Sequence, residues 1–176
     1  MKFTALALPG TFLIEPELIE DERGFFARSF CSEEFKQQGI SPHFVQCNIS
    51  FNKKKNTLRG MHFQTGDKGE DKLIRCTMGA IYDVLIDLRP DSKTYKQWIA
   101  IELSGKNRKM LYVPKGLAHG FQTLEDHSEV FYQMSALFAP GFAGGVRWDD
   151  PAFGIKWPTA YPEVISDKDK SYQNFS

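Results

Sequence analysis

Short runs of apolar and β-branched residues, separated by turn residues, recur along most of the chain. The clearest runs cover residues 72–78, 80–88, 97–103, 109–113 and 130–137. Between them lie Gly79 and the segments 89–92 and 104–107, whose residues favour turns. Short strands at this spacing are typical of an antiparallel sandwich or barrel. The pattern therefore predicts an all-β fold.

Two segments modify this picture. Within residues 80–88, Asp83 and Asp87 do not alternate strictly with the apolar residues, so part of this strand is predicted to be covered on both faces. Residues 32–38 favour one short helix, with Ser32 as its N-cap and acidic residues in its first turn. Because glycines and prolines are scattered and form no linker, we expect a single domain over residues 1–176.

The composition is that of a globular protein. Apolar residues make up 41% of the chain and charged residues 25%, which is far from the composition of disordered chains. Basic and acidic residues both number 22, so no overall field attracts nucleic acid or a membrane surface. The three cysteines form no CxxC pair, and their odd number argues against a disulfide framework. Since we find neither a signal peptide nor about 20 consecutive apolar residues, we expect a cytoplasmic protein.

The densest group of polar residues in an apolar context is LRGMHFQ, residues 58–64. In a regular strand, Arg59 and His62 would point to opposite faces. A bend at Gly60 would bring both to one pocket, since glycine permits unusual backbone angles. Taken alone, His62 is either a structural histidine of the core or a functional one. The functional interpretation needs partners elsewhere in the chain.

A second histidine, His119, follows the predicted strand 109–113 in the segment VPKGLAHGF. Two histidines on different strands of a small barrel suggest a metal site. Metal-binding cupins usually supply an HxH pair, a nearby Glu and a later His, and this sequence has neither the HxH pair nor the Glu that follows it. We therefore expect no metal.

Proton transfer next to a ketone requires a base that titrates near neutrality, an acid on the opposite side and cations for a charged substrate. His62 is the candidate base, because imidazole titrates in that range. Tyr132, in the predicted strand 130–137, is the candidate acid, although an aromatic core residue would give the same pattern. Arg23, Arg59 and Lys72 lie in or beside predicted strands, where phosphate oxygens would be suitable partners unless the three side chains simply reach solvent.

Taken together, these segments resemble the dTDP-4-dehydrorhamnose 3,5-epimerases, which are cupin-like enzymes of deoxysugar biosynthesis that use no metal. Several independent motifs follow one another in the family's order, which is far more specific than any one of them. They are DERGFF from Asp21, QCNIS from Gln46, LRGMHFQ from Leu58, KLIRCTMGAIYDVLIDLRPDSKTYKQW from Lys72, VPKGLAHGFQTL from Val113, WDDPAFGIKWP from Trp148 and SDKD from Ser166.

The resemblance implies a cupin-like jelly-roll barrel with short peripheral helices, a homodimer, and an isomerase that needs no cofactor. It implies that His62 is the base, that Asp169 orients and charges it, and that Tyr132 is the general acid. It also implies a set of residues that hold the nucleotide sugar: Arg23, Gln46, Asn48, Arg59, Lys72, His119, Phe138 and Lys168.

This sequence departs from the family's pattern at several positions that bear on the substrate. Ala27 and Arg28 stand where the family usually has an aliphatic residue and Glu, and Ala143 stands where Glu is common. The family's usual glutamine just before the lysine-bearing strand is replaced near Glu70, and Phe138 replaces a second tyrosine that has been linked in the family to the second epimerisation. A guanidinium in place of a carboxylate reverses local charge and hydrogen-bond direction. These departures therefore concern the nucleobase of the substrate and leave the residues of the proton chemistry unchanged.

The leading hypothesis is an epimerase of nucleotide-linked 4-keto-6-deoxy sugars, by default the dTDP sugar at both C3 and C5. Within the same class, epimerisation at one carbon, or of a CDP- or GDP-linked sugar, stays open. Outside it, a sugar-nucleotide 3,4-ketoisomerase is disfavoured because such enzymes generally place two histidines on neighbouring strand positions. A non-catalytic binding module is disfavoured because base, carboxylate and acid are all present, and a metal-dependent oxygenase would contain bound iron or zinc.

Overall fold

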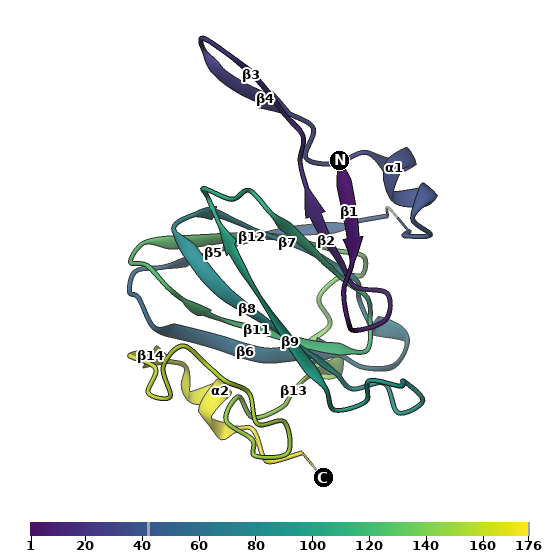
Figure 1. Ribbon diagram of the computed structural model, residues 1–176. Coiled ribbons are helices and arrows are strands. Elements are labelled where there is room, and N and C mark those ends of the chain that lie inside the picture. The colour runs from purple at the N-terminus through teal and green to yellow at the C-terminus, as the bar shows by residue number, and fades with distance from the viewer. Residues whose placement is uncertain (42, 176) are drawn as a thin grey trace.

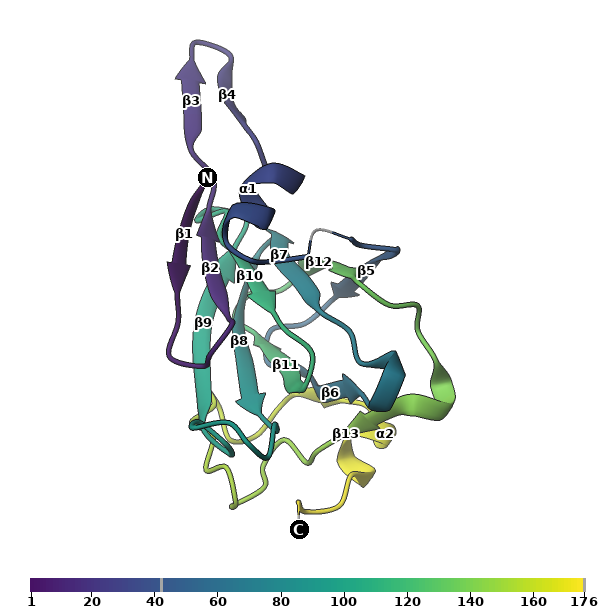
Figure 2. The ribbon, with the colours of Figure 1, turned by 90° about the vertical axis from the view of Figure 1, so that its right-hand side faces the viewer.

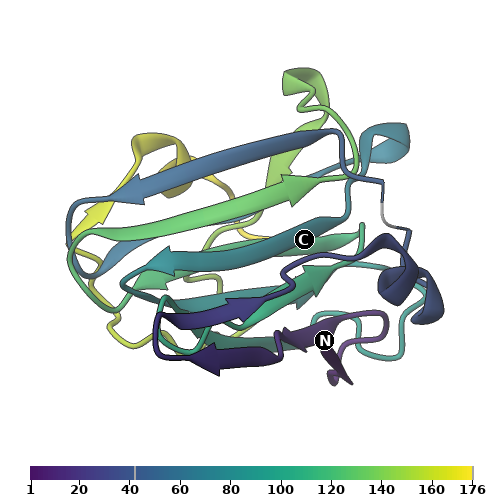
Figure 3. The same ribbon diagram turned by 90° about the horizontal axis from the view of Figure 1, so that it is seen from above.

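In the computed structural model, which describes residues 1–41 and 43–175, the strands form two facing sheets (Figure 1). The first sheet is six-stranded and antiparallel. Its order is β1 (Lys2–Ala5), β2 (Phe12–Glu15), β10 (Met110–Val113), β7 (Lys72–Met78), β12 (Ser128–Met134) and β5 (Gln46–Asn52). Seen from above, the purple N-terminal strands lie at one edge of this sheet and the blue β5 at the other (Figure 3).

The second sheet carries the strand that bears His62. Its order is β13 (Ala143–Gly145), β6 (Thr57–Gln64), β11 (Leu117–Thr123), β8 (Ala80–Asp87) and β9 (Trp98–Ser104). These strands are antiparallel, and the short β14 (Val164–Ile165) adds to β6 in parallel. The predicted all-β jelly-roll barrel is confirmed.

The core lies between the two sheets, because alternate side chains of each strand point inward. Ile74 and Leu111 of the first sheet pack with Leu85 and Leu103 of the second, and none of the four is exposed to solvent. Each such side chain contributes about 1.5–3 kcal/mol when it is removed from water. This apolar packing fixes the distance between the sheets and thus the frame of any site at their open end.

Several elements lie outside the sandwich. The hairpin of β3 (Leu18–Asp21) and β4 (Gly24–Ala27) projects away from it in both views (Figures 1 and 2). The helices are short, as predicted: α1 (Ser32–Gln37), α2 (Asp167–Ser171), and the 3₁₀ turns η1 (Gly66–Lys68) and η2 (Pro140–Phe142). Within the described residues, no helix has the length and apolar character that a membrane crossing requires.

The predicted strands that correspond to β7, β8, β9 and β10 begin and end within one residue of the observed ones, and β7 matches fully. The exception is β12, predicted over residues 130–137 and observed over Ser128–Met134. The chain leaves the sheet at Ser135, whose hydroxyl oxygen accepts a hydrogen bond from the Asp71 N–H at 2.7 Å. Further on, the Ala139 N–H donates to Gln64 Oε1 at 2.6 Å. These side-chain contacts, which periodicity does not reveal, turn residues 135–139 toward β6.

The predicted N-cap of the first helix is wrong. Helix α1 begins at Ser32, but the N-cap is Cys31, which has an extended backbone and no side-chain capping bond. The Phe35 N–H donates to the Cys31 carbonyl at 3.1 Å, and the Phe35 ring is fully buried. Burial of that ring, and not capping by a hydroxyl, therefore sets where the helix begins.

Candidate functional site

A cavity of about 520 Å³ opens between the two sheets. This volume lies in the range of small-molecule sites, about 300–1,000 Å³. Its walls come from β5, β7 and β12 on one side and from β6, β11, β13 and α2 on the other. The structure brings most of the residues proposed from the sequence to its lining: Gln46, Asn48, Arg59, His62, Lys72, His119, Tyr132, Phe138 and Lys168.

The expected bend in β6 is present. His62 is paired with His119 while Arg59 is paired with Phe121, so two residues of β6 lie opposite the single Gly120 of β11. Gly60 has φ +136°, and a Cβ there would lie 2.5 Å from the Gly120 Cα. Only glycines permit this approach. As a result, Arg59 and His62 both line the cavity, as predicted.

His62 is held by Asp169, which helix α2 delivers. The imidazole Nε2 lies 2.7 Å from Asp169 Oδ1, and the Gly60 N–H donates to Asp169 Oδ2 at 3.3 Å. Asp169 itself is fixed because its N–H donates to the Ser166 hydroxyl at 3.1 Å, which caps the helix. A ring proton held on Nε2 leaves Nδ1 of His62 able to accept a proton.

The carboxylate of Asp169 is charged in this setting. Burial alone would raise its pKa, because a buried charge loses its hydration. The hydrogen bond from His62 and its electrostatic attraction to the carboxylate, followed by bonds from Gly60 and Ser166, outweigh burial and hold the pKa of Asp169 below its ordinary value. The His62 side chain is 42% exposed and that of Asp169 only 5%. The imidazole therefore faces the cavity while its carboxylate lies behind it.

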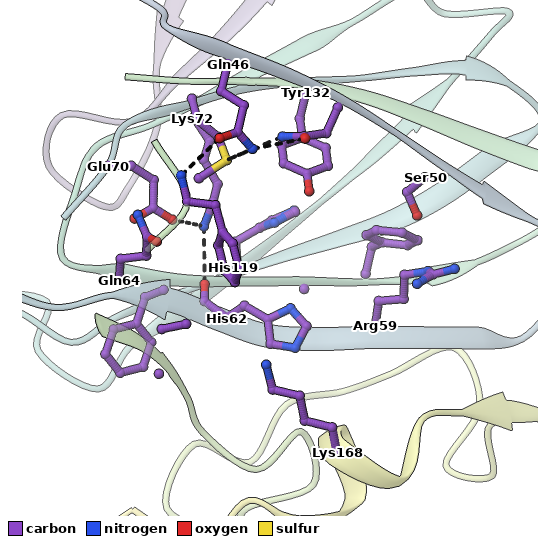
Figure 4. Close-up of a pocket in the computed structure, with 18 of the residues that line it drawn as sticks. Gln46, Ser50, Arg59, His62, Gln64, Glu70, Lys72, His119, Tyr132 and Lys168 are labelled. Atoms are coloured by element: carbon purple, nitrogen blue, oxygen red, sulfur yellow. Dashed lines mark hydrogen bonds and ion pairs between the residues drawn. The ribbon is translucent and has the colours of Figure 1, made fainter. Parts of the chain in front are cut away.

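Tyr132 lies across the cavity from His62. Figure 4 shows it on the upper wall, with its hydroxyl directed toward the wall that carries His62. Burial raises the pKa of Tyr132, and the charge of Glu70 adds to this while that of Arg59 opposes it. The phenol therefore stays protonated at neutral pH and is able to donate its proton.

His119 lies opposite His62 in the sheet and contacts a different carboxylate. Its Nε2 contacts Asp83 Oδ1, and the Asp83 side chain is fully buried. The second oxygen, Oδ2, has no hydrogen-bond partner among the described residues. The predicted covering of this strand on both faces explains how a carboxylate comes to be enclosed here.

Lys72 and Glu70 form a buried ion pair at the cavity wall. Lys72 Nζ lies 2.7 Å from Glu70 Oε1, and it donates to the backbone carbonyl of His62 at 3.4 Å (Figure 4). The negative charge of Glu70 therefore balances the lysine directly.

Other lining residues are also held by neighbours. Arg59 Nε donates to Asn52 Oδ1 at 2.7 Å, which directs the guanidinium along β5. Gln46 donates to Asn48 Oδ1 at 3.0 Å and accepts from the Phe138 N–H at 2.9 Å. Lys168 points from α2 toward the ring of His62 (Figure 4). The lining of the cavity is thus rich in amide and cationic donors.

Arg23 does not reach the cavity of its own chain. It lies at the tip of the β3–β4 hairpin, is 86% exposed and pairs with Asp21. Arg28 is likewise remote, since it pairs with Glu34 of α1 at 2.8 Å. The substrate role of Arg23 therefore stays a prediction that a single chain does not support.

Within residues 1–41 and 43–175, no group of three or more His, Cys, Asp or Glu side chains is arranged to hold a metal ion. Each cavity histidine contacts a carboxylate through its Nε2 atom instead.

Sequence reasoning did not assign two residues that the structure brings to the site. Asp83 was visible as an aspartate within an apolar strand, and such a residue needs a partner when buried. Tyr172, just beyond α2, lines the cavity and left no signal in the sequence pattern.

Known proteins share both the sequence and the fold. The sequence model of the dTDP-4-dehydrorhamnose 3,5-epimerase family matches residues 5–176. The enzyme of that name from Salmonella typhimurium is 41% identical over 93% of this chain and 89% of its own. The crystal structure of the Bacillus anthracis enzyme, with TDP and PPi bound, has a TM-score of 0.95 at 41% identity and covers 99% of both chains.

A Legionella pneumophila dTDP-6-deoxy-D-glucose-3,5-epimerase, solved in complex with dTDP-4-keto-L-rhamnose, has a TM-score of 0.92 at 33% identity. It covers 98% of this chain and 92% of its own. The resemblance drawn from the sequence motifs is confirmed by the family match, by the relatives and by the shared fold. The chain belongs to the dTDP-4-dehydrorhamnose 3,5-epimerase family.

Proposed function

We propose that this protein epimerises a nucleotide-linked 4-keto-6-deoxy sugar, by default dTDP-4-dehydro-6-deoxyglucose at C3 and C5. The observation that carries the proposal is the placement of a carboxylate-held imidazole and a protonated phenol on opposite walls of one cavity. Inversion at a carbon needs a base on one face and an acid on the other. His62 and Tyr132 meet that requirement.

The reaction follows from the acidity of carbons next to a ketone. Nδ1 of His62 takes the proton from C3 or C5, and the electron pair moves onto the C4 oxygen as an enolate. Asp169 stabilises the imidazolium that forms. Tyr132 then gives its hydroxyl proton to the same carbon from the opposite face, and the ketone returns. The phenolate recovers a proton from solvent, and the imidazolium releases one.

Charged and polar side chains supply the remaining needs of this reaction. Lys72 and His119 line the cavity and are suited to stabilise the enolate oxygen. Arg59 and Lys168 are suited to hold a diphosphate, with Gln46 and Asn48 as neutral hydrogen-bonding partners. No step of this proton transfer requires a redox cofactor or a metal.

Solvent isotope exchange tests the proposal. With the protein in deuterated water, dTDP-4-dehydro-6-deoxyglucose should gain deuterium at C3 and C5. NMR and mass spectrometry measure this gain. His62→Ala should abolish exchange at both carbons, whereas Tyr132→Phe should slow inversion more than proton removal. If wild-type protein exchanged neither carbon, the epimerase assignment would be wrong.

A single-centre epimerase, or one acting on a CDP- or GDP-linked sugar, is the alternative that specific residues favour. Phe138 and Ala143 line the cavity at positions where the family usually has a tyrosine and a glutamate. The same exchange assay with the CDP and GDP sugars distinguishes these cases. Deuterium at one carbon only, or faster turnover of another nucleotide, would replace the default substrate.

We also infer a homodimer built through the projecting hairpin. The Phe26 side chain is 71% exposed on this arm, and Ile19 and Ile49 are exposed on the arm and on the outer face of β5. Apolar side chains exposed on the arm and on β5 favour a partner surface over water. A second copy that covers the arm would also carry Arg23 toward a neighbouring cavity, which accounts for its predicted role.

Light scattering after size-exclusion chromatography tests the dimer. Phe26→Ser should convert the dimer to a monomer, since it removes apolar area from the contact. Arg23→Ala should remain dimeric and raise KM with little change in kcat. A wild-type protein that is monomeric at micromolar concentration would contradict the inference.

A further inference from the structure

Tyr172 stands beside the His62–Asp169 pair, although nothing in the proposed chemistry uses it. It is the first residue after helix α2 and lines the cavity. Its ring meets the His62 ring edge-on, with centroids 6.1 Å apart and planes at 62°. This separation lies in the range of favourable aromatic pairs, about 4.5–7 Å. The tyrosine therefore contacts the proposed base directly.

Gly145 of β13 completes the arrangement. It is paired with His62 in the sheet, and a Cβ added to it would lie 2.2 Å from Cζ of Tyr172. The three nearest atoms to that Cβ all belong to Tyr172. Gly145 does not have a left-handed backbone, so any residue type could adopt its conformation. The Tyr172 ring, and not the backbone, accounts for the glycine.

The segment around Tyr172 is anchored on both sides. Arg147 donates to the Lys170 carbonyl at 3.1 Å, and the Phe175 N–H donates to Asp150 at 2.5 Å. The Phe175 ring also packs on Phe153, with centroids 5.4 Å apart. The ring of Tyr172 is thus held against Gly145 and His62 by structure on either side of it.

The hydroxyl of Tyr172 is buried and has no hydrogen-bond partner among the described residues. Burial raises the pKa of Tyr172, and the nearby charge of Asp169 raises it further, so the phenol stays neutral. A neutral, enclosed phenol is a poor base. What the ring supplies is apolar cover, which strengthens a hydrogen bond by keeping water from competing for it.

We propose that Tyr172 is a positioning residue for His62. Its ring fixes the plane of the imidazole and keeps water from the bond between His62 and Asp169. This inference rests on the proposed function of His62 as the base. It predicts that the ring matters and that the hydroxyl matters much less.

Paired substitutions of Tyr172 test this in the full-length protein. Tyr172→Ala should lower kcat by about 10- to 100-fold, because a base displaced by about 1 Å loses that much. KM should change by less than about threefold, since the ring is not needed to bind the nucleotide. Tyr172→Phe should keep kcat within about twofold of wild type. Wild-type kcat in Tyr172→Ala, or equal losses in both variants, would overturn the proposal.

A double-mutant cycle with Gly145 makes the test specific to this contact. Gly145→Ala should lower kcat because the new methyl displaces the ring, whereas Gly141→Ala, with nothing within 4 Å, should not. In the Tyr172→Ala background, Gly145→Ala should cause no further loss, because the two changes remove one interaction. Losses that multiply independently would contradict the shared mechanism.

A readout that needs no turnover separates this inference from the proposed function. The ring N–H of His62 bonded to Asp169 should give a downfield proton resonance that is absent in His62→Asn. It should persist in Tyr172→Phe and broaden or vanish in Tyr172→Ala, where water reaches the bond. If wild-type protein turned over no nucleotide sugar, the proposed function would fail, and this resonance would still decide the role of Tyr172.

Discussion

The two histidines of the cavity lie opposite each other on β6 and β11, yet their carboxylates reach them by different routes. Asp83 comes from β8, the strand next to His119, and the pair is almost wholly enclosed. Asp169 comes from a helix 107 residues away in sequence and meets a His62 that is open to the cavity. The enclosed pair belongs to the body of the sheet, while the open pair is assembled across the fold. The difference suggests that Asp83 contributes mainly to structure and Asp169 mainly to chemistry.

The largest expected effect is on catalysis at the open pair. Asp169→Asn keeps the size of the side chain but removes a negative charge. That charge stabilises the imidazolium and fixes the tautomer of the neutral imidazole. We expect kcat to fall by about 10⁴-fold, as when other catalytic histidines lose the charge of their carboxylate. The matched control is Asp167→Asn on the same helix, whose side chain is fully exposed and which should retain wild-type kcat. A kcat for Asp169→Asn within tenfold of wild type would remove the distinction between the two pairs.

The next effect is on stability at the enclosed pair. Asp83→Asn should lower the free energy of unfolding by about 1–3 kcal/mol, because it leaves buried polar groups without suitable partners. Urea denaturation should show a lower midpoint at an unchanged slope. Asp67→Asn, at an exposed site, should lie within about 0.5 kcal/mol of wild type. If Asp83→Asn were as stable as this control, the enclosed pair would not have the structural role assigned to it.

The same contrast shows what the sequence could predict. Strand β7 and the bend at Gly60 follow from local patterns, because alternation and glycine act over a few residues. Asp83 was within reach of such reasoning, since an aspartate inside an apolar strand needs a partner when it is buried. No local pattern relates Asp169 to His62, and only the family resemblance suggested that pair.

Neither the local patterns nor the family resemblance indicated Tyr172. Its position depends on how the segment after α2 is anchored to the residues around Arg147 and Asp150, which are long-range contacts. The shift of β12 has the same origin, because Ser135 and Gln64 bind the backbone N–H groups of Asp71 and Ala139, contacts that a strand pattern does not reveal. Patterns along the chain predict elements well, but side chains that bind another element's backbone decide where those elements end.

The smallest effect is the pH dependence of stability at the open pair. Because the pKa of Asp169 is lower in the folded protein than its ordinary value, its charge stabilises the fold above that value, about 3.9. This contribution should be lost as the pH falls from about 4 through the folded pKa. We expect the difference in unfolding free energy between wild type and Asp169→Asn to shrink across urea titrations at pH 5, 4 and 3. Taking the difference cancels the other carboxylates, since both proteins share them. A difference that stayed constant down to pH 3 would mean that His62 does not favour the charged form of Asp169.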